Sequence, residues 1–62
     1  MAIIDFWKIK EEKIENVTLR ILKDRKGKLF VNIRNEETKT EVTIPEDVYI
    51  KIYEYAKRLL KS

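Results

Sequence analysis

The residues best suited to chemistry lie between Arg20 and Arg34, where basic side chains are concentrated. These 15 residues carry six Lys or Arg side chains against the single acid Asp24, a net charge of +5, whereas the other 47 residues sum to −2. Segregated positive charge of this kind attracts polyanions. Phe30 lies in the same stretch, and proteins that hold unpaired nucleic-acid strands combine cations for the phosphates with aromatic rings for the bases.

We therefore predict a nucleic-acid-binding face for single-stranded DNA or RNA, with little sequence preference. Its candidate residues share the outer face or the turn of one predicted hairpin and the strand beside it: Arg20, Lys23, Arg25, Lys26, Lys28, Phe30, Arg34 and Lys39. Two alternatives remain open. Lys and Arg also protect exposed strands against aggregation without binding a ligand, and Phe30 would then pack under the N-terminal segment or a second copy.

Most other chemistries lack the residues they need. The chain has no Cys and no His, which excludes a thiol nucleophile, an imidazole base and a Cys or His zinc site. No phosphate-binding glycine motif is present, and the turn acids Asp24, Glu36 and Glu37 have no paired carboxylate on a rigid element. We expect no catalytic residues, no metal, no cofactor, no small-molecule substrate and no enzymatic activity.

Length and composition limit the architecture. Sixty-two residues allow one domain, residues 1–62, with a small core. Charged residues make up 40% of the chain, and this resembles the composition of thermophile proteins. No apolar stretch approaches the roughly 20 residues of a membrane span, and no signal peptide is recognisable. We expect a cytoplasmic protein with no membrane contact.

Alternating apolar residues predict a β-hairpin in the basic stretch. Strands are expected from Val17 and through residues 28–34, joined by a turn over residues 23–27. Asp24 and the only glycine, Gly27, fit a type I turn closed by a glycine bulge. Aligning the apolar faces pairs Ile21 with Leu29 and Arg20 with Phe30.

Two further strands are expected, one before and one after this hairpin in the sequence. After a turn over residues 35–38, a third alternating run covers residues 39–44 and should pair Val31 with Val42, which leaves Arg34 beside Lys39. Near residues 3–10 a strand is expected that is apolar on both faces, as in strands that are covered on both sides or lie at an interface.

A helix should follow, opened by the segment Thr43-Ile44-Pro45-Glu46, which has capping-box spacing and a proline in the first turn. Its apolar stripe is wider than a three-stranded sheet needs, and Ile50 lies among the charged residues. Part of the helix is therefore expected to contact a second copy in a homodimer. The interface residues we predict are Tyr49, Ile50, Tyr53 and Leu60.

These elements predict an α+β fold, in which a twisted antiparallel meander of three to four strands is followed by one C-terminal helix packed on one face. The main alternative function is a small homodimeric protein-interaction module that uses the apolar N-terminal strand and the helix face. In that case the basic hairpin would only be solvated.

The order of elements and the run from Lys26 to Arg34 resemble the positive cofactor four family of single-stranded-DNA-binding transcriptional coactivators. The similarity covers roughly residues 14–60. It implies a dimer that binds unpaired strands with its sheets. The positions that match the family's motif are the turn lysines Lys26 and Lys28, the strand-end Arg34, and Pro45 with Glu46 at the helix opening.

The chain departs from that family where the family places aromatic residues. Arg25 stands just before the turn lysines, and Asn35, Glu36 and Glu37 follow the strand-end arginine. The resemblance therefore implies a reduced capacity for stacking on bases.

Overall fold

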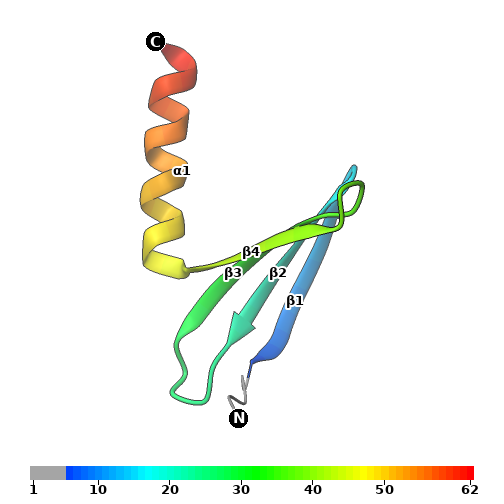
Figure 1. The fold of residues 1–62 in the computed structure, drawn as a ribbon. Coiled ribbons are helices and arrows are strands. Elements are labelled where there is room, and N and C mark those ends of the chain that lie inside the picture. The colour runs from blue at the N-terminus through cyan, green and yellow to red at the C-terminus, as the bar shows by residue number, and fades with distance from the viewer. Residues whose placement is uncertain (1–5) are drawn as a thin grey trace.

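The protein is described by a computed structural model of residues 6–62. It forms a four-stranded antiparallel sheet, in the order β1-β2-β3-β4, followed by one helix (Figure 1). The predicted α+β fold is confirmed. The elements are β1 (Trp7–Ile14), β2 (Val17–Lys23), β3 (Leu29–Asn35), β4 (Thr40–Pro45) and α1 (Glu46–Lys61).

The β2–β3 turn has the predicted chemistry. The Gly27 amide donates to the Asp24 carbonyl at 3.0 Å, and Gly27 has φ +87°, a conformation that glycine adopts without steric cost. The Asp24 amide donates to the Lys28 carbonyl, so these two residues close the hairpin. The predicted register is therefore wrong by two residues, and Phe30 lies opposite Leu22 rather than Arg20. A shift of two keeps every side chain on its predicted face.

The β3–β4 turn begins one residue later than expected. Asn35 remains in β3, and its side-chain oxygen accepts hydrogen bonds from the Glu37 and Thr38 amides. Lys39 takes φ +62° in the turn, and its amide donates to the Asn35 carbonyl. The register between β3 and β4 also differs from the prediction by two residues. As a consequence, Arg34 faces Glu41 instead of Lys39.

The first strand is displaced from its predicted place. It was expected near residues 3–10 but runs from Trp7 to Ile14, and Glu15 with φ +53° forms the turn to β2 with Asn16. Lys and Glu are well suited to this position because charged side chains protect an exposed sheet edge. Ile3 and Ile4, which the prediction included, lie outside the described residues.

Helix α1 begins at Glu46, as predicted, but its capping box does not form. Pro45 is both the last residue of β4 and the helix N-cap, with no side-chain cap hydrogen bond. Thr43 stays within β4, where its hydroxyl accepts a hydrogen bond from Asn32 at 2.9 Å. Acidic residues in the first turn and basic residues in the last turn match the helix dipole.

The sheet has two faces of different character. The apolar face carries Val17, Leu19, Ile21, Leu29, Val31, Ile33, Val42 and Ile44, and the polar face carries Glu11, Thr18, Arg20, Asn32, Arg34, Glu41 and Thr43. Among the described residues, Val31 is the only buried hydrophobic side chain. Helix α1 contacts β3 and β4 and then extends away from the sheet (Figure 1). Of its residues, only Tyr49 is half-buried.

Candidate nucleic-acid interface

Residues 23–28, which we call the hairpin tip, carry the net charge of the whole chain. They include four cations and one acid, a net of +3, so the remaining residues sum to zero. The acid is Asp24, whose carboxylate accepts hydrogen bonds from the Lys26 and Lys28 amides at 2.9 and 2.8 Å. Within residues 6–62, the side chains of Lys26 and Lys28 are exposed and have no carboxylate within ion-pair distance.

An aromatic pair adjoins the tip. The Phe6 and Phe30 rings meet edge to face, with centroids 5.0 Å apart and planes inclined by 72°. The Lys28 ammonium lies 5.6 Å from the centre of the Phe30 ring, within the range of a cation–π contact. Phe30 therefore packs against the N-terminal segment, one of the two environments left open by the sequence. Phe6 remains 37% exposed.

The arginines of the polar face are already paired with acids. Arg20 Nε donates to Glu11 Oε1 at 2.8 Å, and Lys8 approaches the same oxygen at 3.4 Å. The second arginine, Arg34, donates to Glu36 at 3.1 Å and to Glu41 at 2.8 Å. This cluster holds three cations and three acids, so the middle of the polar face is electrically balanced.

Two buried polar residues support this ion-pair network. Asn32 is 3% exposed, and its amide nitrogen donates to Glu41 and Thr43, both at 2.9 Å. Thr18 is 5% exposed and donates to Glu36 at 2.7 Å. Their burial was not predicted, because the contacts depend on the register that the two turns set. Recognising Asn35 as the residue that opens its turn would have placed Arg34 opposite Glu41.

The network holds its carboxyl groups in the ionised state. Hydrogen bonds from Arg20 and then Lys8 lower the pKa of Glu11. The Thr18 hydroxyl and Arg34 lower the pKa of Glu36. The Asn32 amide, followed by Arg34, lowers the pKa of Glu41. In turn Glu36 and Glu41 raise the pKa of Arg34.

Acidification should therefore destabilise the fold. A carboxyl whose pKa is lower in the folded state stabilises the protein above its ordinary pKa of 4.5, and this contribution is lost as the pH falls below that value. We expect the melting temperature, followed by circular dichroism, to decline below pH 4.5. In the Glu41→Gln variant the decline should be shallower, because one titrating group is removed. An equally steep decline in that variant would contradict the role of Glu41.

The structure separates the eight predicted binding residues. Four of them lie in the hairpin tip and Phe30 lies next to it, although Lys23 belongs to the apolar face of its strand. Arg20 lies in mid-sheet. Arg34 and Lys39 lie toward the opposite end of β3, about 15 to 20 Å away at the rise of a strand. The tip with Phe6 and Phe30 is therefore the compact candidate site.

The predicted dimer residues are accessible. Ile50, Tyr53 and Leu60 are 48%, 52% and 85% exposed, and Tyr49 is half-buried and stacks on Tyr53. Over the described part of the chain, no group of acids is placed to hold a metal ion, and no helix is long and apolar enough to cross a membrane. Comparison with protein-family models, curated proteins and solved structures found no match.

Proposed function

We propose that this protein binds single-stranded nucleic acid at the hairpin tip. The observation that carries the proposal is the location of the net charge. The tip holds +3, while the polar face is balanced by its own acids. Within the tip, Lys26 and Lys28 have no carboxylate within ion-pair distance among the described residues, so a phosphate can approach either ammonium group without breaking an ion pair.

The aromatic pair favours an unpaired strand over a duplex. Bases of a single strand expose their faces and stack on aromatic side chains with little sequence preference. Phe30 lies against Phe6 and beside the exposed Lys28, so one nucleotide can contact a ring and a cation at once. The helix offers no comparable surface for a groove of duplex DNA, because its exposed stripe is apolar.

The resemblance to the positive cofactor four family supports the same substrate, since Lys26, Gly27 and Lys28 belong to the tip. We assign no direct part in binding to Arg20, Arg34 or Lys39. The proposal is for a cytoplasmic binding protein without catalytic activity, and it makes no distinction between DNA and RNA.

A titration of a fluorescently labelled oligothymidine, read by anisotropy at several salt concentrations, tests this proposal. If Lys23, Lys26 and Lys28 each neutralise one phosphate, the logarithm of the affinity should fall with the logarithm of salt concentration with a slope of about −2. A duplex of equal length should bind more weakly. Binding that does not change with salt, or no binding at low salt, would contradict the proposal.

A further inference from the structure

Within residues 6–62, large apolar surfaces on the sheet and on the helix are left without a partner. On the sheet, Ile14 and Val42 are 52% and 50% exposed. On the helix, Leu59 and Leu60 are 73% and 85% exposed. Shallow apolar depressions of about 370 and 450 Å³ mark the uncovered end of the apolar face, lined by Ile33, Asn35, Thr40, Glu41 and Val42 in one case and by Ile14, Glu15, Asn16, Val17 and Leu19 in the other.

The chain is less compact than a stable monomer of its size. Its accessible surface is 5455 Å², whereas a folded monomer of 7.5 kDa is expected to expose about 4,200 Å². Its radius of gyration is 13.1 Å, against about 10.6 Å for a compact domain of this length. The difference in area is about 1,200 Å² per chain, or some 2,400 Å² for two chains. An interface that buries this much surface is typical of obligate homodimers.

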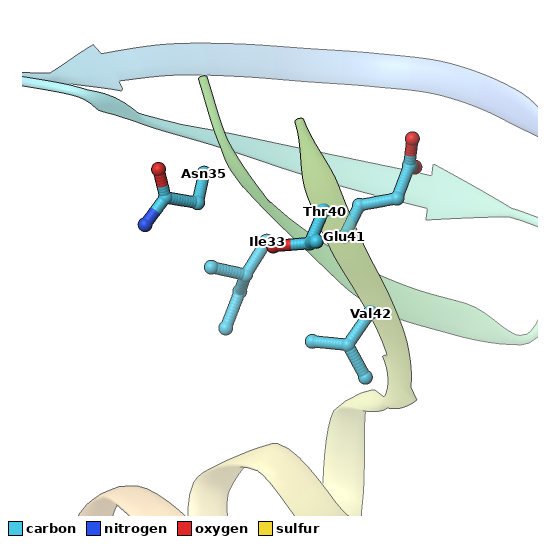
Figure 2. A pocket seen from close by; sticks show the side chains of 5 residues that line it. All are labelled: Ile33, Asn35, Thr40, Glu41 and Val42. Carbon is cyan, nitrogen blue, oxygen red and sulfur yellow. The ribbon is translucent and has the colours of Figure 1, made fainter. Parts of the chain in front are cut away.

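The helix cannot cover this surface on its own sheet. Pro45 ends β4 and also caps α1, so no loop residue separates the two elements. The direction of the helix is therefore set by the end of the strand, and of the four strands α1 contacts only β3 and β4. In Figure 2, Ile33 and Val42 point to the side of the sheet on which the helix lies, and both line the first of the two depressions.

We propose that helix α1 of a second copy fills this space, so that two chains form a symmetric dimer in which each helix packs on the partner's apolar sheet face. The two surfaces are matched in length, since a helix of 16 residues and a strand of seven both extend about 23 to 24 Å. Both surfaces are present on one chain, so a two-fold axis satisfies both at once.

The helix stripe that enters the interface contains Tyr49, Ile52, Tyr53, Ala56, Leu59 and Leu60, which share one side of the helix at 100° per residue. Ile50 lies on the opposite, charged side with Asp47 and Glu54 and is given no part in this interface. This proposal does not depend on nucleic-acid binding, because none of the stripe residues belongs to the hairpin tip.

Sedimentation equilibrium of the full chain tests the dimer, with an expected mass of twice 7.5 kDa. Leu59→Glu and Val42→Glu should each weaken association by roughly 100-fold or more, because each would bury an unpaired charge. The matched control is Ile50→Glu, the same change of chemistry on the other side of the helix, and it should leave association within about threefold of the original.

Cross-linking of other variants tests the same interface if the glutamate variants fail to fold. The chain has no cysteine, so single-cysteine variants can be mixed and joined with a short thiol-reactive linker. Val42→Cys should form a covalent heterodimer with Leu59→Cys and not with Ile50→Cys. The reverse pattern would overturn the arrangement. A wild-type chain that stays monomeric at all concentrations would overturn the dimer itself, and its binding to lipid vesicles would assign the apolar face to a membrane surface.

Discussion

The double variant Lys26→Glu/Lys28→Glu should lose single-strand binding while it retains its fold. Both side chains are exposed and have no ion-pair partner within the described residues, and their backbone amides, not their ammonium groups, hold the turn. Like charges facing a phosphate cost several kcal/mol, so we expect the affinity to fall by roughly 100-fold or more at low salt. The melting temperature should change little.

The control for this variant is Lys51→Glu/Lys61→Glu, which makes the same change in net charge on the helix. If binding depends on the tip, this control should lose much less affinity, and only through the long-range field of the molecule. Equal losses in the two double variants would show that net charge alone governs binding. A large loss of stability in the tip variant would point instead to a structural role for the two lysines.

Removing the aromatic rings should reduce affinity for single strands more than for duplexes. Stacking of one base contributes about 1 to 3 kcal/mol, so the double variant Phe6→Leu/Phe30→Leu should bind oligothymidine roughly 5- to 150-fold more weakly. Leucine keeps an apolar side chain at position 30, which is the register partner of Leu22. Anisotropy titrations with a single strand and a duplex of equal length measure the difference.

The matched control for the aromatic variant is Tyr55→Leu, since Tyr55 is 60% exposed on the helix and contacts Arg58. It should leave binding unchanged. If both nucleic-acid forms lose affinity equally in Phe6→Leu/Phe30→Leu, the rings support the shape of the tip and do not stack on bases. The proposed preference for single strands would then be wrong.

Much of the fold follows from local patterns in the sequence. Period-two alternation marks β2, β3 and β4, and the apolar stripe marks the helix from Glu46 onward. Gly27 predicts its turn because only glycine adopts φ +87° without strain. These features need no knowledge of distant contacts. The first strand was predicted too early in the chain, because the charged residues of an edge strand resemble those of a loop.

The candidate site was harder to predict because it depends on register. A difference of two residues does not change which face a side chain occupies, but it changes its neighbours. Arg34 was expected beside Lys39 and instead meets Glu41, which converts a predicted binding cation into a member of an ion-pair network. Contacts of this kind are set by the number of residues in a turn, which composition and alternation do not reveal.

Mapping the bound strand on the protein by NMR tests the central claim most directly. The ¹⁵N-labelled chain would be titrated with a short oligothymidine and the amide shifts followed residue by residue. We expect the largest changes at residues 23–30 and at Phe6, with small changes at Arg34, Lys39 and along α1. Changes centred on the polar face or the helix, or an absence of changes at low salt, would contradict binding at the hairpin tip.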